Sequence, residues 1–244
     1  MRFVPNSQIK SKEKIIEFLK QERIGRIATI DENGYAFVAP MNFVYHNDAI
    51  YIHGFSRGEK YDNIRRNAKC GFEVDKELSF LPSYFFEPPT DASLTDTLYI
   101  SVVIKGTAQT VTDNQEKAGA LNALMEKGQT EGGYEKLEPD MPSIKGVRLT
   151  KITPETMTGK YKLGKYWKPE EKMRIATRMM ERAAKNPRRV LQLLNVAGLD
   201  KLDEETTRNL AWTHATELVR MMGYENKTKG YPEISLHLTE EVDW

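Results

Sequence analysis

The sequence predicts a mainly β protein: an antiparallel barrel with short helices between its strands, followed by a C-terminal all-helical extension. Short apolar runs rich in β-forming residues recur through roughly the first two thirds of the chain, and tight-turn signals join them. Strands joined in this way favour an antiparallel barrel over a doubly wound parallel sheet. After about Tyr166 the apolar residues recur at helical spacing instead. We therefore expect a barrel domain over residues 1–165 and the extension over 166–244.

The barrel is expected to begin with a helix that Ser11 caps and that stops at Gly25. Roughly six strands should follow, and Asn33-Gly34 is the turn signal that joins the first two as a hairpin. The expected strands lie at 26–30, 35–45, 49–53, 69–75, 98–111 and 146–159.

Side chains alternate along the third of these strands, AIYIH. Ile50 and Ile52 share the face that we expect to be buried, so His53 points to the opposite face. Short helices are expected at 58–67 and 114–128. The aromatic and proline-rich stretch 78–97 suits neither regular element and is expected to be an insertion, either a lid over a bound ligand or a dimer contact.

The extension should contain three helices. The first covers about 167–185, Asn186-Pro187 opens the second as cap and first-turn proline, and Asp203 caps the third, which ends near Gly223. Methionine and leucine residues at helical spacing along these segments are expected to form core.

Composition narrows the function classes. Thirty-six Lys and Arg residues against thirty-five Asp and Glu leave a net charge of +1, so no global field favours nucleic acid or an anionic membrane. No apolar run is long enough to span a membrane, the first residues lack the apolar core of a signal peptide, and Cys70 is the single cysteine. We expect a soluble cytoplasmic protein in which Cys70 is a buried thiol. No metal site is expected, because His214 and Glu217 share a helix face without a third ligand.

The segment HGFSRGEK, residues 53–60, concentrates glycine and positive charge between a strand and a helix start. A phosphate monoester binds well where a helix N-terminus, close backbone approach and cationic side chains meet. The segment is also compatible with an ordinary strand-to-helix turn bearing solvated charges. It matches neither the Walker loop nor the Rossmann glycine pattern.

The surrounding pattern resembles the FMN-binding split-barrel superfamily that includes pyridoxamine 5'-phosphate oxidase, and in particular its nitroimidazole-resistance-like branch. The resemblance covers about residues 10–160. It is carried by GRIATIDENGYAFVAPMNFVY, AIYIHGFSRGEKYDNIRRNAKCGFEVD and LYISVVIKGTAQTV, in the order found in that family. It implies a six-stranded antiparallel split barrel that binds FMN.

The resemblance also implies which residues contact FMN. In the family, FMN contacts come from the strand beside the flavin ring, the strand end at the cofactor, the phosphate-binding positions and one further strand. The residues of this sequence that match these positions are Pro40, Met41, Asn42, His53, Gly54, Ser56, Arg57, Lys60, Ser101 and Val102. Two roles are open for His53: a catalytic polar contact or proton donor at the flavin, or a structural histidine bonded to a backbone carbonyl.

By the same resemblance, the protein is a flavoprotein oxidoreductase, nitroreductase or oxidase-like, that passes electrons from NAD(P)H to a small organic acceptor such as a nitro compound. FMN would lie between the subunits of a homodimer. The end matching the second phosphate site of pyridoxamine-phosphate oxidase, TGKYKLGKYW, leads into an unrelated helical segment, which argues against that activity. Two alternatives stay open: a non-catalytic flavin-binding or sensing module whose helical tail binds a protein partner, and a related split barrel that uses haem or a deazaflavin.

Overall fold

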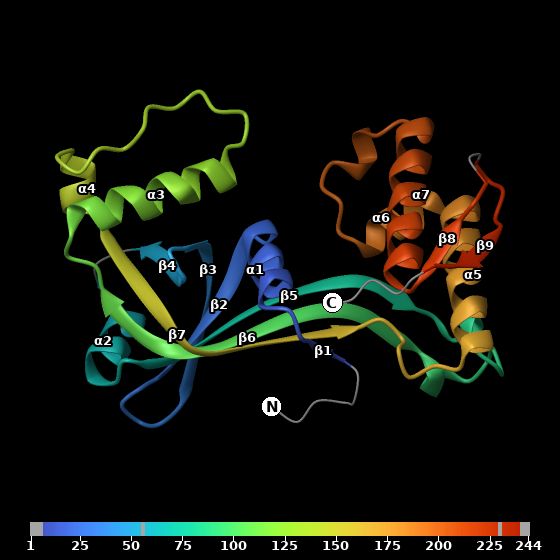
Figure 1. Ribbon diagram of the computed structural model, residues 1–244, viewed down its shortest axis with the longest axis horizontal. Coiled ribbons are helices and arrows are strands. Elements are labelled where there is room, and N and C mark those ends of the chain that lie inside the picture. The colour runs from blue at the N-terminus through green and yellow to red at the C-terminus, as the bar shows by residue number, and fades with distance from the viewer. Residues whose placement is uncertain (1–6, 55–56, 229–230, 240–244) are drawn as a thin grey trace. The chain divides into compact units, whose positions relative to one another are not determined.

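The computed structural model describes residues 7–54, 57–228 and 231–239. Its main sheet has seven strands in the order β1-β7-β4-β3-β2-β5-β6, and β6 also pairs with β7 (Figure 1). This additional pairing closes β2 to β7 into a barrel and confirms the expected mainly β fold class. The strands are β1 (Gln8–Ile9), β2 (Ile24–Ile30), β3 (Ala36–His46), β4 (Ala49–Gly54), β5 (Lys69–Leu81), β6 (Asp96–Thr110) and β7 (Arg148–Lys162).

The hairpin of β2 and β3 forms where the turn signal predicts it. The two strands are antiparallel, with Ile30 opposite Ala36. The Asp31 carboxylate accepts hydrogen bonds of 2.8 Å from the backbone N–H groups of Asn33 and Tyr35, which fixes the turn. β4 continues the antiparallel pattern on β3 and pairs on its other side with β7.

Helix α1 (Lys12–Gln21) starts as expected, because Ser11 Oγ accepts from the Lys14 backbone N–H at 3.2 Å. Its predicted end at Gly25 is wrong. The helix ends at Gln21, and Gly25 lies within β2 opposite Met41. A Cβ on Gly25 would lie 2.4 Å from the Phe72 ring, so this glycine serves close packing across the barrel rather than helix termination.

Three helices lie against the barrel strands: α1, α2 (Glu59–Arg66) and α3 (Asn114–Gly128). Ile50 and Ile52 are fully buried, as the strand alternation predicts. Tyr51, on the other face of β4, is buried as well, because its cluster with Val44 and Leu149 packs against α3. His53 remains exposed beyond this covered area.

The predicted insertion at 78–97 starts too early. β5 continues to Leu81, and β6 already begins at Asp96. Leu78 and Leu81 are buried, so the burial of apolar side chains along β5 continues through these residues. Between the strands lie the short 3-10 helices η1 (Ser83–Phe85) and η2 (Ala92–Leu94).

The chain forms two compact units. The first contains residues 9–75 and 101–160, and the second contains 76–100 together with residues from 161 onward. The strands β5, β6 and β7 each begin in one unit and end in the other. The sequence placed the division at residue 165 and assigned 76–100 to the barrel, whereas these residues cluster with the helices in the structure.

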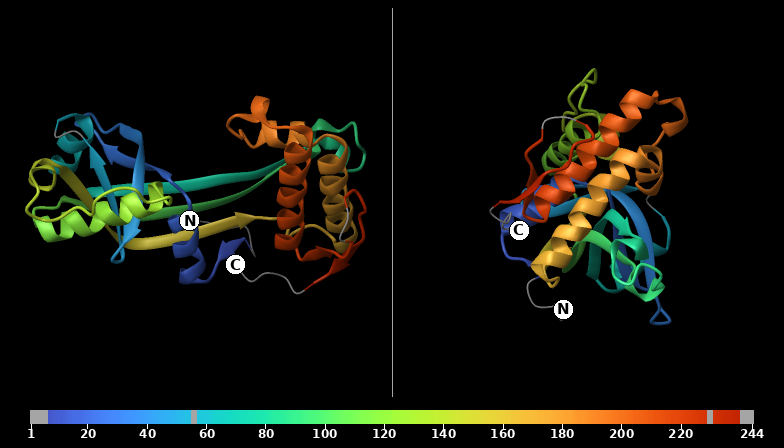
Figure 2. Two further views of the ribbon diagram at one scale, coloured as in Figure 1. Left: turned by 90° about the horizontal axis from the view of Figure 1, so that it is seen from above. Right: turned by 90° about the vertical axis from the view of Figure 1, so that its right-hand side faces the viewer.

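The second unit is largely helical and contains α5 (Pro169–Lys185), α6 (Pro187–Leu193) and α7 (Glu204–Met221). Helices α5 and α7 lie side by side (Figure 2) and bury a shared apolar seam. Met179 and Met180 are core residues, as expected, but Leu210 is 43% exposed. The remaining elements of the described chain are α4 (Pro142–Gly146), η3 (Leu199–Lys201), β8 (Tyr224–Asn226) and β9 (Leu236–Leu238).

The strands β8 and β9 form a separate two-stranded sheet that the sequence did not predict. The extension is therefore helical apart from this pair. Within the described ranges, no helix combines the length and the apolar character needed to cross a bilayer.

Candidate functional site

The middle of β3 and the end of β4 bring four of the predicted site residues together. Phe43 lies opposite Ile52 in the antiparallel register, so the next steps along the two strands place Asn42 beside His53 and Met41 beside Gly54. Successive side chains point to opposite faces, so Asn42 and His53 share the outer face, and Met41 lies on the face of the buried Ile52.

Three side chains converge on Gly54. A Cβ at this position would lie 3.3 Å from Lys60 Nζ, 3.5 Å from the Tyr61 hydroxyl oxygen and 3.7 Å from Met41 Cε. The Lys60 ammonium also lies 3.5 Å from Met41 Sδ and 4.9 Å from the centre of the Tyr61 ring. The glycine therefore lets a cation and a hydroxyl approach the end of β4.

A second cation reaches this corner from β7. Arg148 pairs with Gly54 in the strand register, and its guanidinium lies 5.6 Å from the centre of the Tyr61 ring. Within the described ranges neither Lys60 nor Arg148 has a carboxylate partner at ion-pair distance. Arg26 on β2 differs, because it is paired with both Glu73 and Asp75. We call Lys60, Tyr61 and Arg148, grouped at Gly54, the cationic corner.

Burial shapes the electrostatics of the cationic corner. Desolvation lowers the pKa of Lys60, since burial penalises the charged ammonium. Desolvation also raises the pKa of Tyr61, against the smaller opposing influence of Thr150 and Arg148. Among the described residues, neither the Tyr61 nor the Thr150 hydroxyl makes a well-formed hydrogen bond, although both are buried. An anion at this corner would offer an acceptor to the buried Tyr61 hydroxyl.

A small cavity of about 100 Å³ lies at the outer face beside Asn42 and His53. It occurs where the C-terminal end of α3 meets the middle of β3, the end of β4 and the connection from α1 to β2. Its lining consists of Arg23, Asn42, Phe43, His53, Leu124, Lys127 and Gly128.

Lys127 is the unusual group of this cavity. Its ammonium donates to the backbone carbonyls of Leu19 at 2.9 Å and Phe43 at 3.1 Å, and lies 3.8 Å from the centre of the Phe43 ring. Burial lowers the pKa of Lys127 to about 8; nearby Glu22 opposes this shift and nearby Arg23 reinforces it. The cavity thus borders an amine that is close to titrating at neutral pH.

The other predicted site residues are less closely grouped. Arg57 and Pro40 are exposed, and Pro40 lies opposite Arg26 in the β2–β3 register. Ser56 lies outside the described residues. Ser101 and Val102 lie on β6, which pairs with β5 and β7 and not with β3 or β4. The side chain of Val102 is fully buried in the core.

Sequence reasoning missed Arg148, Tyr61, Arg23 and Lys127. Arg148 could have been found as a cation at the start of a predicted strand, and Tyr61 as the neighbour of Lys60. Arg23 and Lys127 are about a hundred positions apart, and no local pattern connects them.

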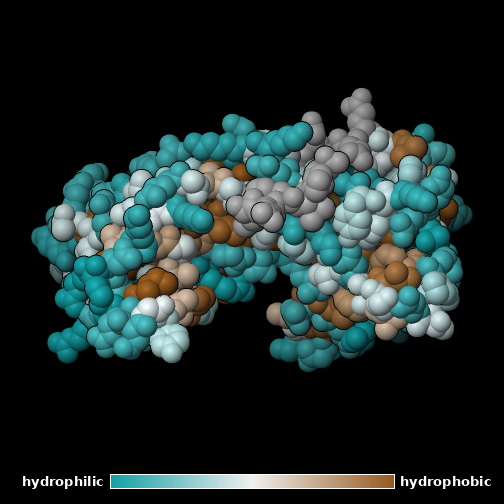
Figure 3. Space-filling view, turned by 90° about the horizontal axis from the view of Figure 1, so that it is seen from below, coloured by the Kyte–Doolittle hydropathy of each residue, from teal (hydrophilic) through white to brown (hydrophobic). Residues whose placement is uncertain are grey.

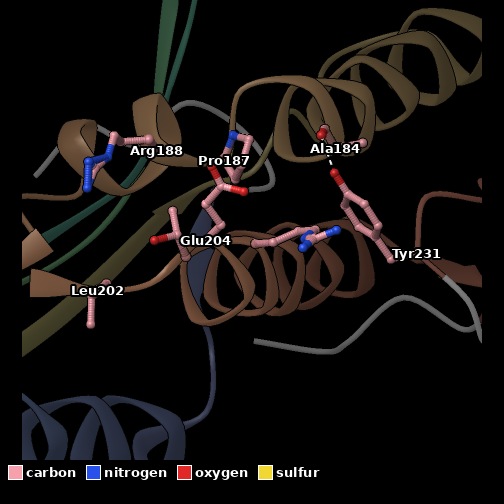
Figure 4. Close-up of a pocket in the computed structure, with 8 residues that line it drawn as sticks. Ala184, Pro187, Arg188, Leu202, Glu204 and Tyr231 are labelled. Atoms are coloured by element: carbon pink, nitrogen blue, oxygen red, sulfur yellow. Dashed lines mark hydrogen bonds between the residues drawn. The ribbon is translucent and has the colours of Figure 1, made fainter.

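A larger cavity of about 620 Å³ lies in the helical unit (Figure 4). Here Tyr231 donates to the carbonyl of Ala184, and Arg208 lies 5.3 Å from the centre of the Tyr231 ring. Arg188 donates to the Leu199 carbonyl at 3.1 Å, and Glu204 adds a carboxylate to the lining. The lining of this cavity thus contains both positively and negatively charged groups, and none of its residues is a predicted site residue. Across the described ranges, no group of three or more potential metal ligands occurs.

Solved structures share the barrel fold at low sequence identity. A protein named as a candidate 5-nitroimidazole antibiotic resistance protein, from Bacteroides thetaiotaomicron, is 24% identical with a TM-score of 0.52, over 63% of this chain and 86% of its own. A flavocytochrome of Azotobacter vinelandii is 21% identical with a TM-score of 0.53, over 67% and 72% of the two chains. An FAD and haem binding protein of Mycobacterium smegmatis is 17% identical with a TM-score of 0.54, over 69% and 79%.

None of the curated protein sequences compared with the chain is similar enough to count as a match. The closed sheet and these structural likenesses define the class as a split barrel. The sequence pattern of the pyridoxamine 5'-phosphate oxidase family matches residues 11–161, and the chain belongs to this family.

Proposed function

We propose that the protein binds FMN at the end of β4 and is an oxidoreductase that passes electrons from NAD(P)H to a small organic acceptor, including nitro compounds. The cationic corner carries this proposal. Lys60 and Arg148 offer two positive charges at the backbone of Gly54, and no carboxylate of the described chain neutralises them at ion-pair distance. A phosphate monoester carries close to two negative charges and fits such a pair of donors.

The residues present fit the phosphate of a flavin nucleotide. Lys60, Arg148 and Arg57 would hold it, and the buried Tyr61 hydroxyl would gain an acceptor. The N-terminus of α2 adds backbone donors next to Gly58. Of the two acidic residues in its first turn, Asp62 is paired with Arg65, and Glu59 is exposed.

Asn42 and His53 would lie at the edge of the flavin ring, with an amide and an imidazole on the outer face. Flavin supplies the redox chemistry when bound, and the chain contributes position and electrostatics. His53 would orient the acceptor or donate a proton to it. The likeness to flavin and haem proteins supports a prosthetic group of this kind and leaves FAD and haem as the cofactors to be distinguished.

A homodimer is the proposed assembly. The outer face of β2 and β3 exposes three apolar side chains: Ile24 at 54%, Val38 at 56% and Ile30 at 43%. The face shown in Figure 3 is mainly hydrophilic, with hydrophobic side chains in separate patches. A second copy could cover this strand face. In such a dimer the Ser101 position of β6 could come from the partner subunit, which would account for its distance in the sheet from β4.

Absorption spectroscopy of the purified protein is the first test. The proposal predicts flavin bands near 450 nm and a released pigment that chromatography and mass spectrometry identify as FMN. A Soret band would indicate haem, and release of FAD would identify FAD as the flavin cofactor in place of FMN. A colourless protein that takes up no FMN at micromolar concentrations would refute the proposal. Oxidation of NAD(P)H with nitroaromatic acceptors then tests turnover.

A further inference from the structure

The small cavity beside Asn42 and His53 has a one-sided charge pattern. Arg23 and Lys127 are both in its lining, which contains no aspartate or glutamate. The Arg23 charge opposes protonation of Lys127, and the carboxylate of nearby Glu22, which is not part of the lining, favours it.

Lys127 retains capacity for a ligand. An ammonium has three N–H donors, and two of them bind the carbonyls of Leu19 and Phe43. These two bonds fix the side chain in place and add no negative charge. The third donor is therefore available to an anion in the cavity, to which the Arg23 guanidinium adds a planar donor group.

The remaining lining suits an organic molecule. Leu124 and Phe43 provide apolar surface, and Asn42 and His53 provide neutral polar groups at the edge that we assign to the flavin ring. A volume of about 100 Å³ accommodates a carboxylate and a few carbon atoms, and the rest of a ligand would extend past Asn42 and His53.

We propose that this cavity is an acceptor subsite that binds the carboxylate of a small organic acid through Arg23 and Lys127. The acceptor role rests on the proposed function, whereas binding of the carboxylate rests on the cavity alone. The competing explanation is that Lys127 only ties α3 to α1 and β3, in which case Arg23 would contribute nothing to binding.

The direct test is calorimetric titration of the protein with benzoate and with benzamide, which share a ring and differ in charge. Benzoate is expected to bind at least about tenfold more tightly than benzamide, because charge-assisted hydrogen bonds favour the carboxylate. Arg23→Gln, at an exposed side chain, should weaken benzoate about tenfold and leave benzamide unchanged. Lys127→Gln should do the same, and Lys145→Gln, an exposed lysine on α4, should have no effect.

FMN affinity, measured in parallel, separates this inference from the proposed function. Unchanged FMN affinity in Arg23→Gln with weakened benzoate binding supports the subsite. In turnover, the KM for 4-nitrobenzoate should then rise in this variant while that for 4-nitrobenzamide stays constant. Equal binding of benzoate and benzamide, or benzoate binding that is insensitive to Arg23→Gln, overturns the inference even if FMN binds. A protein that takes up no flavin but binds benzoate through Arg23 refutes the proposed function and retains the carboxylate site.

Discussion

Replacement of Lys60 by alanine tests the assignment of the cationic corner to the FMN phosphate. The ammonium is partly desolvated, lies 3.3 Å from the Cβ position of Gly54 and has no carboxylate of the described chain at ion-pair distance. Loss of a hydrogen bond to a charged group costs about 1.5–3 kcal/mol, which is roughly a ten- to hundredfold weaker Kd. Arg148→Ala should have an effect of similar size, and the double variant should deviate from additivity if both side chains hold one phosphate.

Quenching of flavin fluorescence at fixed ionic strength measures these affinities, since salt screens exposed charges. Riboflavin lacks the phosphate, so Lys60→Ala should leave its affinity unchanged. Lys69→Ala, at an exposed lysine on β5, provides a charge-matched control. If Lys60→Ala binds FMN as tightly as the unaltered protein, or loses riboflavin to the same extent, the phosphate does not lie at Lys60.

Three further outcomes follow from the packing and the titration behaviour. Gly25→Ala should destabilise the barrel by about 1–3 kcal/mol in urea unfolding because of overpacking against Phe72, while Gly146→Ala, with open space around it, should change little. In an NMR titration of labelled lysine side chains, Lys127 should lose its proton near pH 8, and ordinary lysines near pH 10.4; a midpoint near 10 for Lys127 would contradict its burial. Burial raises the pKa of Cys70 to about 11, so its native-state reaction with thiol reagents at pH 8 should be much slower than in urea, and equal rates would place the thiol at the surface.

Local sequence signals predicted the parts of the fold that depend on neighbouring residues. The Asn33-Gly34 turn, the Ser11 cap and the Asp203 cap, whose carboxylate accepts from the Thr206 N–H at 2.6 Å, all form as expected. Prediction failed where tertiary packing decided the outcome. Gly25 follows a predicted helix, at a position where glycine often marks the helix end. The structure shows instead that the close approach of the Phe72 ring requires a glycine there.

The candidate site was predictable only in part, for the same reason. Lys60 and Gly54 lie within one short motif, so their proximity follows from the strand-to-helix turn. Arg148 joins them through the pairing of β4 with β7, about ninety residues apart in sequence. Lys127 reaches the cavity because α3 folds back over β3 and β4, which no local spacing encodes. The flavin assignments of Ser101 and Val102 stay predictions, since β6 and β4 do not pair in the described sheet and β7 lies between them.

Residues 76–100 cluster with the helices, and this affects how the extension can be studied. Arg182 donates to the Phe80 carbonyl and the Ser79 hydroxyl at 2.8 Å, and His214 lies 2.9 Å from the Leu78 carbonyl. In a chain that ends at residue 165, the Leu78 and Phe80 carbonyls and the Ser79 hydroxyl would lose these hydrogen-bond partners. Phe85 and Phe86, which are now buried, would become exposed. Loss of activity after such a deletion would then report aggregation rather than a role of the tail. Single substitutions on the outer surface of α5 to α7 are the sounder way to ask what the helices contribute.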